Sequence, residues 1–121
     1  HWETQKIFGD DSISVNATAV RVPVFFGHAE AVHIETRMPI SVEQVKALLA
    51  DAPGVVLLEN NADFPTQVCS AAGKDEVFVG RIRQDLSHEN GINLWVVADN
   101  IRKGAATNSI QIAEHLIRDY L

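Results

Sequence analysis

Two side chains with different chemical abilities stand at the ends of the segment Arg21-Val-Pro-Val-Phe-Phe-Gly-His28, which is otherwise apolar and rich in strand-forming residues. The guanidinium of Arg21 can bind a carboxylate through two parallel hydrogen bonds. The imidazole of His28 can accept or donate a proton near neutral pH. An anion-binding group and a proton carrier this close together suggest a functional site in addition to packing.

The same segment also has a purely structural interpretation. Its valines alternate, which predicts a strand with one buried face formed by Val20, Val22 and Val24. Arg21 then points into water, and Gly27-His28 forms a turn into the next strand. A straight strand of this length spans roughly 23 Å and places the two side chains on opposite faces. Both can contact one molecule only if the chain bends before His28, and Gly27 permits such a bend.

A second candidate lies in Asp99-Asn-Ile-Arg-Lys-Gly-Ala-Ala-Thr-Asn108, which joins a buried apolar run to a helical pattern. Its small residues allow another group to approach the backbone, and the free amides of a helix N-terminus can bind an anion or an amide. Asn100 offers both a donor and an acceptor. The glycine spacing is not that of a phosphate-binding loop or a dinucleotide fingerprint. A packed strand-to-helix turn remains the alternative.

The remaining reactive side chains predict neither a metal site nor a nucleophile. The five histidines form no pair at helical i, i+4 spacing, and no Cys-x-x-Cys motif is present. Cys69 has no histidine near it in sequence and stands in a polar stretch. An ordinary thiol is therefore favoured over a nucleophilic one, which needs an activating neighbour.

Composition excludes several classes of protein. The 121 residues suffice for one domain with a real core, and 46% of them are hydrophobic. A net charge of −6 without a Lys/Arg cluster argues against nucleic-acid binding. No run approaches the roughly 20 apolar residues of a membrane span, and no signal peptide is visible. The single cysteine suits a reducing cytosol, so we expect a cytoplasmic protein without membrane partners.

The periodicity of apolar residues predicts the elements that position these groups. Strand patterns cover residues 13–26, 31–36, 55–59, 76–84 and 92–98. Helical patterns cover the first nine residues, the segment from Ser41 to Pro53 and the last dozen residues. Ser41 with Gln44 predicts a capping box at the start of the middle helix. Residues 60–74 are expected to be mostly loop.

The order of these elements predicts an α+β fold, a mixed or antiparallel sheet with helices on one face. The last helix carries an apolar stripe, formed by Ile110, Ala113, Leu116, Ile117, Tyr120 and Leu121. The first residues resemble the end of a helix closed by Gly9, and the sequence does not begin with Met. We therefore expect a piece of a longer chain.

Several motifs along the chain occur together in one known family. They are Arg21-Val-Pro-Val24, Gly27-His-Ala-Glu30, Asp63-Phe-Pro-Thr-Gln67, Asn93-Leu-Trp-Val-Val-Ala-Asp-Asn100 and Lys103-Gly-Ala-Ala-Thr-Asn108. This combination resembles the C-terminal part of bacterial aspartate-β-semialdehyde dehydrogenases, over essentially all 121 residues. The resemblance implies the dimerisation and substrate domain of a fold like that of glyceraldehyde-3-phosphate dehydrogenase. Residues 1–121 would form part of that domain, and the helix at about 103–121 would pack toward a nucleotide-binding domain outside this chain.

The resemblance also implies an activity. Enzymes of this family reduce aspartyl-4-phosphate to L-aspartate-4-semialdehyde with NADPH and release phosphate, on the route to lysine (through diaminopimelate), methionine and threonine. They act as cytoplasmic homodimers on a small-molecule substrate and use no metal. By resemblance, His28 is the catalytic acid and base, Arg21 binds the substrate α-carboxylate, and Asn100 contacts the nicotinamide end of NADP.

This chain lacks other parts that the family requires. It has no dinucleotide glycine fingerprint and no counterpart of the nucleophilic cysteine, whose motif does not match the surroundings of Cys69. We therefore expect these 121 residues to be inactive by themselves. The alternative is a stand-alone dimerisation or ligand-binding module that reuses this half of the fold without catalysis.

Overall fold

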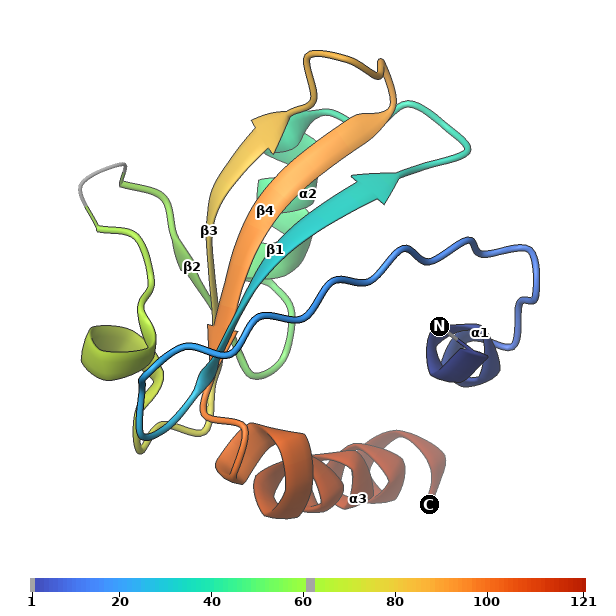
Figure 1. Ribbon diagram of the computed structural model, residues 1–121. Coiled ribbons are helices and arrows are strands. Elements are labelled where there is room, and N and C mark those ends of the chain that lie inside the picture. Colours follow the sequence, from blue (N-terminus) through green and yellow to red (C-terminus); the bar gives the residue numbers. More distant parts are fainter. Residues whose placement is uncertain (1, 61–62) are drawn as a thin grey trace.

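A four-stranded mixed sheet forms the centre of the described structure (Figure 1). The computed structural model describes residues 2–60 and 63–121. Its strands are β1 (His28–Glu35), β2 (Val55–Leu58), β3 (Val77–Gln84) and β4 (Gly91–Ala98), in the order β1-β4-β3-β2. β4 pairs antiparallel with β1 and with β3, whereas β2 runs parallel to β3. The predicted α+β fold with a mixed sheet is confirmed.

The apolar run in β4 explains why this strand is central. Ile92 and Val97 are almost fully buried, and they point to opposite faces of the sheet because side chains alternate along a strand. Ile92, Leu94 and Val79 form the buried core on one face. A strand that is apolar on both faces is stable only with neighbours on both sides and layers above and below it.

The described residues contain three α-helices: α1 (Trp2–Phe8), α2 (Val42–Ala50) and α3 (Thr107–Tyr120). α2 packs on the face of β2 and β3 that carries the core, and Figure 1 shows it behind the sheet. Its predicted capping box is present, since Ser41 Oγ accepts from Gln44 N at 3.2 Å and Gln44 Oε1 accepts from Ser41 N at 2.9 Å. Over the described residues, no helix has the length and apolar character that crossing a membrane requires.

α3 lies beyond the end of the sheet at which β4 stops (Figure 1). It follows a short π-helical turn, η2 (Arg102–Ala106), and makes most of its contacts with that turn. Its predicted apolar stripe is largely exposed, at Ile110, Leu116, Ile117 and Tyr120. The amphipathic pattern thus gave the helix correctly, but the described residues do not cover its apolar face.

The other face of the sheet is covered in part by a second π-helical turn, η1 (Gln67–Ala71). The segment before it docks through Pro65, whose carbonyl oxygen accepts a hydrogen bond from Trp95 Nε1 at 2.9 Å. Gly80 permits this docking, because a Cβ there would lie 2.8 Å from Pro65 Cδ. The expectation of mostly loop over 60–74 was therefore incomplete, and its residues 61–62 lie outside the described structure.

The strand predicted over residues 13–26 is wrong. The structure describes residues 9–27 in full and has no helix or strand there. Val20 and Val22 are 80% and 48% exposed, so the alternating valines do not form a buried face. Pro23 has no N–H to donate to a strand pair, and Val24 N bonds back to Val22 O at 2.9 Å in a tight turn. The first strand begins at His28 instead.

Candidate functional site

His28 is placed at the end of the sheet, as the first residue of β1. Its backbone pairs with Ala98, the last residue of β4, and its side chain is exposed. The chain enters β1 through Gly27, whose φ of +94° is a conformation that other residues rarely adopt. Gly27 thus forms the bend before His28 that contact of both side chains with one molecule would require.

The turn at Gly27 is enclosed on two sides. A Cβ at this position would lie 3.0 Å from Gln67 Cβ and 3.3 Å from the carbonyl oxygen of Ala98. The turn therefore packs between η1 and the end of β4, where Figure 1 shows the incoming segment bending back into β1. Only glycine satisfies both the backbone angle and the available space.

Asn100, which follows the end of β4, contacts this turn. Its Oδ1 atom accepts a hydrogen bond from Gly27 N at 3.1 Å, across 73 positions of sequence. The structure thus brings Asn100 to the residue preceding His28. Throughout residues 2–60 and 63–121, no side chain or backbone group pairs with the Asn100 Nδ2 donors. An exposed amide with free donors can bind an acceptor oxygen of a ligand.

A buried carboxylate fixes the backbone beside Asn100. Asp99 is 4% exposed and accepts hydrogen bonds from the backbone N–H groups of Gly73 at 2.9 Å, Ile101 at 3.0 Å and Arg102 at 3.4 Å. These bonds hold the pKa of Asp99 below its usual range, and the bond from Gly73 contributes most to this lowering. Sequence reasoning missed this role. An aspartate directly after a buried strand and before a helix was the available signal.

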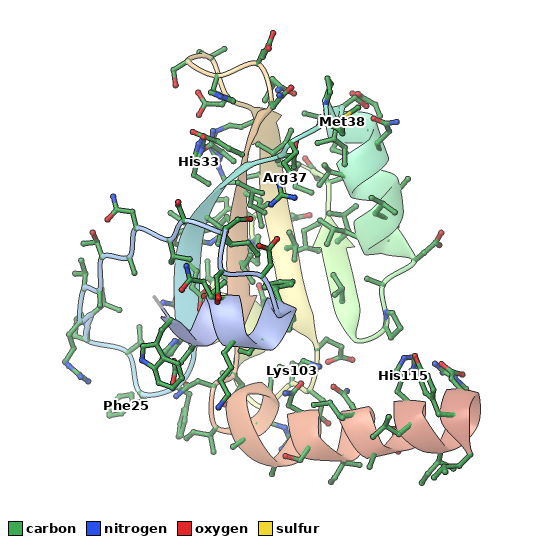
Figure 2. The ribbon with its side chains drawn as sticks, turned by 90° about the vertical axis from the view of Figure 1, so that its right-hand side faces the viewer. Phe25, His33, Arg37, Met38, Lys103 and His115 are labelled. Atoms are coloured by element: carbon green, nitrogen blue, oxygen red, sulfur yellow. The ribbon has the colours of Figure 1, made fainter. Side chains whose placement is uncertain are left out.

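A second polar network holds the start of α3. Arg102 donates from Nε to Asp75 Oδ1 at 2.6 Å and from Nη2 to Oδ2 at 3.0 Å, and Thr107 Oγ1 donates to the same carboxylate at 2.9 Å. The hydrogen bond from Arg102 is the main cause of the lowered pKa of Asp75. Lys103, labelled in Figure 2, donates a hydrogen bond to the side chain of Gln111, eight residues further along the chain. Side-chain hydrogen bonds therefore hold the strand-to-helix turn, although most of its residues are exposed.

Arg21 lies in the irregular segment before β1 and is exposed. In the described part of the chain, no hydrogen bond or ion pair joins its guanidinium to His28 or Asn100. The structure brings the turn of His28 together with Asn100, and it leaves Arg21 available in solvent. Its assignment as a carboxylate-binding residue stays a prediction.

Cys69 is exposed within η1, and its backbone N–H donates to Thr66 Oγ1 at 3.1 Å. That bond caps the turn through the backbone and does not involve the thiol. Over the described residues, no group of three or more His, Cys, Asp or Glu side chains is arranged to hold a metal ion.

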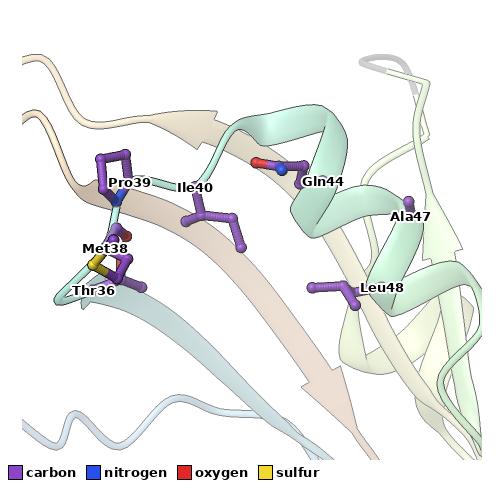
Figure 3. Close-up of a pocket in the computed structure, with 7 residues that line it drawn as sticks. All are labelled: Thr36, Met38, Pro39, Ile40, Gln44, Ala47 and Leu48. Carbon is purple, nitrogen blue, oxygen red and sulfur yellow. Dashed lines mark hydrogen bonds between the residues drawn. The ribbon is translucent and has the colours of Figure 1, made fainter.

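An open apolar pocket of about 500 Å³ lies away from His28 (Figure 3). Its walls are Thr36, Met38, Pro39, Ile40, Gln44, Ala47 and Leu48. It begins where β1 ends, whereas His28 is where β1 starts, so the length of the strand separates the two. Its polar lining residues, Thr36 and Gln44, form hydrogen bonds within the protein, and its lining contains no charged residue that could bind a charged substrate.

Comparison with known sequences now identifies the family. The model of a family described as semialdehyde dehydrogenase, dimerisation domain, matches residues 1–103. This chain belongs to that family. The membership confirms the resemblance to aspartate-semialdehyde dehydrogenases that the motifs indicated.

Relatives of this dimerisation domain carry the same enzyme name. The chain is 69% identical over 119 residues to the aspartate-semialdehyde dehydrogenase of Shewanella sp. (strain DB6705), covering 98% of this chain and 35% of that enzyme. Identity to the enzyme of Aquifex aeolicus (strain VF5) is 52% over 122 residues, covering 99% and 36%. The chain therefore spans about a third of the length of the curated relatives it matches.

Solved structures of such enzymes contain the same dimerisation-domain fold. Aspartate semialdehyde dehydrogenase II from Vibrio cholerae, crystallised in complex with ASA, matches with a TM-score of 0.90 and 68% identity, covering 99% of this chain and 35% of that one. The enzyme from Francisella tularensis, at 24% identity, still gives a TM-score of 0.80 over 93% of this chain and 33% of its own. The predicted relation to the fold of the dehydrogenase dimerisation domain is confirmed.

Proposed function

We propose that this chain is the dimerisation and substrate-binding part of an aspartate-semialdehyde dehydrogenase, which reduces aspartyl-4-phosphate to L-aspartate-4-semialdehyde with NADPH and releases phosphate. The observation that carries the proposal is the match to enzymes of that name over 98% of the chain at 69% identity. The match favours this function over a stand-alone module, because the matched proteins are named as enzymes and extend well beyond the shared segment.

Each proposed site residue has a task that its position permits. A cysteine thiolate from the rest of the enzyme attacks the acyl carbon, the bond to phosphate breaks, and a thioester forms. His28 takes the proton of that thiol and later gives a proton to the developing hydroxyl group. Arg21, free in solvent, binds the α-carboxylate through its two parallel donors. Both side chains are exposed, as groups that meet a substrate must be.

Asn100 is the proposed contact for the cofactor. When bound, NADPH supplies the hydride that reduces the thioester carbonyl. The unpaired Nδ2 donors of Asn100 would hold the carboxamide of the nicotinamide, while its oxygen remains bound to Gly27. The main cofactor-binding domain lies outside these 121 residues, and the exposed stripe of α3 faces that domain in the complete enzyme.

The same proposal covers the partners. The match to a dimerisation domain supports association with a second copy of the enzyme. The 121 residues by themselves should be inactive, because the nucleophile is supplied from outside them. A cytoplasmic location accords with the single cysteine, which is free and exposed.

A graft tests the proposed function directly. The 121 residues replace the matching third of the Shewanella enzyme, and NADPH oxidation with aspartyl-4-phosphate is measured. We expect the graft to turn over within about tenfold of the parent, and its His28→Ala version to lose about 10²- to 10⁴-fold. Cys69→Ser serves as the matched control and should leave turnover unchanged. A folded graft without activity would contradict the proposal.

A further inference from the structure

The backbone beside His28 depends on a side chain that is distant in sequence but lies at the same end of the sheet. The ladder between β1 and β4 ends at the pair His28 and Ala98, so no further strand bond holds the turn that precedes it. Gly27 N–H, the next donor along the chain, is instead taken by Asn100 Oδ1 at 3.1 Å. The side-chain oxygen of Asn100 thus takes the place of a backbone carbonyl and adds one hydrogen bond beyond the end of the pairing between β1 and β4.

We propose that Asn100 is a positioning residue for His28, because its side-chain oxygen fixes the turn from which the imidazole projects. The inference rests on the proposed function, in which His28 moves the proton of the thiol. It assigns Asn100 a second task besides the contact with the cofactor. The two tasks use different atoms, since the turn is held by Oδ1 and the cofactor would meet Nδ2.

Asn100 can act in this way because its own backbone is held. The preceding residue, Asp99, is buried and bound to three backbone N–H groups, one of which belongs to Gly73 in the turn before β3. Gly27 is confined as well, since Gln67 and the end of β4 leave no room for a side chain there. A hydrogen bond between two confined segments fixes a position more tightly than one between mobile loops.

The separation of atoms makes the inference testable with close variants. Asn100→Asp keeps an oxygen acceptor for Gly27 N–H and removes the amide donors. Asn100→Leu, of similar size, removes both, and Asn100→Ala serves as a second apolar variant. Arg102→Gln is the matched control, because it alters the same strand-to-helix turn without touching Gly27.

Hydrogen exchange in the complete enzyme gives the first measurement. In Asn100→Leu and Asn100→Ala, exchange in the peptide containing Gly27 and His28 should rise about tenfold or more, because the amide loses its acceptor. Asn100→Asp and Arg102→Gln should exchange like the unaltered enzyme. Equal exchange in all four variants would overturn the inference.

The second measurement is the single-turnover burst of phosphate from aspartyl-4-phosphate without NADPH, which excludes effects on the cofactor. Asn100→Leu should slow the burst about 10- to 100-fold through misplacement of His28, and Asn100→Asp should restore most of the rate. Equal losses in the Leu and Asp variants would overturn the positioning role. His28→Ala is measured beside them. An unchanged burst in that variant would refute the proposed acid–base role of His28. The exchange data would still show separately whether the hydrogen bond from Gly27 to Asn100 holds the turn.

Discussion

At the scale of single residues, the candidate site combines atoms that are hydrogen-bonded within the protein with atoms that have no such partner in the described residues. Asn100 uses its oxygen within the protein and keeps its amide donors for a ligand. His28 and Arg21 are both exposed, whereas Asp99 is buried and fully engaged with backbone donors. In the proposed function, the exposed residues meet the substrate, and the buried carboxylate holds the backbone beside Asn100.

His28→Asn in the complete enzyme should lower kcat about 10²- to 10⁴-fold, because an amide cannot carry the proton. The melting temperature should not change, since the side chain is exposed. Steady-state kinetics and a thermal melt give both quantities. His88→Asn, at the far end of the sheet, is the control, and equal kcat in the two variants would contradict the assignment.

Arg21→Lys should act on binding of the substrate. An ammonium group cannot form the two parallel hydrogen bonds of a guanidinium, so KM for aspartyl-4-phosphate should rise about tenfold at nearly constant kcat. KM for NADPH should remain the same. Titration of each substrate separately checks this, and an unaltered KM for the acyl phosphate would remove Arg21 from the site.

At the scale of elements, local signals predicted those that depend on local structure. The capping box at Ser41, the apolar run of β4 and the helical spacing in α3 are local patterns, and each was enough to predict its element. The alternating valines near Arg21 did not form a strand, because a strand also needs a partner and Pro23 interrupts the donors. The docking of Pro65 onto the sheet depends on Gly80 and Trp95, which no local pattern connects.

The predictions for the site differ in the same way between local and long-range features. Residue type and motif were enough to single out His28 and Asn100. Their connection through Gly27 could not be predicted, since 73 positions separate the two ends of that hydrogen bond. The role of Asp99 also required the structure, because burial of a carboxylate beside three donors is a property of the folded chain.

Gly80→Ala should weaken the docking of the segment before η1. The added methyl would lie 2.8 Å from Pro65 Cδ and 3.1 Å from the carbonyl oxygen of Leu58, so the segment or strand must shift. We expect a loss of about 1–3 kcal/mol in the free energy of unfolding, as for other overpacked sites. Urea unfolding measures it. Gly104→Ala, where the nearest atom is 3.9 Å away, is the control and should show no such loss.

The end of β1 carries a pH-dependent contact. The Nε2 atom of His33, which is labelled in Figure 2, lies 3.2 Å from Glu35 Oε1. Its Nδ1 atom lies 3.1 Å from Asp85 Oδ2 and 3.3 Å from Asn93 Oδ1. His88 Nε2 lies 4.0 Å from Glu35 Oε2. The hydrogen bond to Glu35 is the main cause that raises the pKa of His33 above 6.5. The contact therefore joins β1 to the hairpin between β3 and β4 most strongly when His33 is protonated.

His33→Asn should consequently destabilise the protein more at about pH 5.5 than at about pH 8.5. Because the pKa is higher in the folded state, the stabilisation is complete below the unfolded value of 6.5 and is lost as pH rises through the folded one. Unfolding midpoints of both proteins at the two pH values test this. A difference that grows with pH would contradict it.

At the scale of the whole molecule, the sheet and α2 form a packed body, whereas α3 offers an uncovered apolar stripe. Exposed apolar patches on this scale promote association. The structure thus has one well-packed side and one side adapted to another surface, as a part of a larger enzyme would require.

The 121 residues alone should self-associate through this stripe. Ile117→Asp, at a side chain 64% exposed, should shift the population toward monomers about tenfold or more, because a charge cannot be buried between two helices. Sedimentation velocity over a range of concentrations measures the shift. Glu114→Asp on the same helix is the control. Identical sedimentation of all three proteins would show that the stripe is not the contact.

The place of β4 has a consequence for synthesis on the ribosome. Of the four strands that the structure describes, β4 is translated last, yet it lies between β1 and β3. β1 therefore emerges without a partner and waits while α2, β2 and β3 are translated, and pairing over such distances in sequence is slow. Before Ala98 is added, the nascent chain exposes unpaired edges on β1 and β3, which can join other chains. Pairing of β4 with both strands covers these two edges at once.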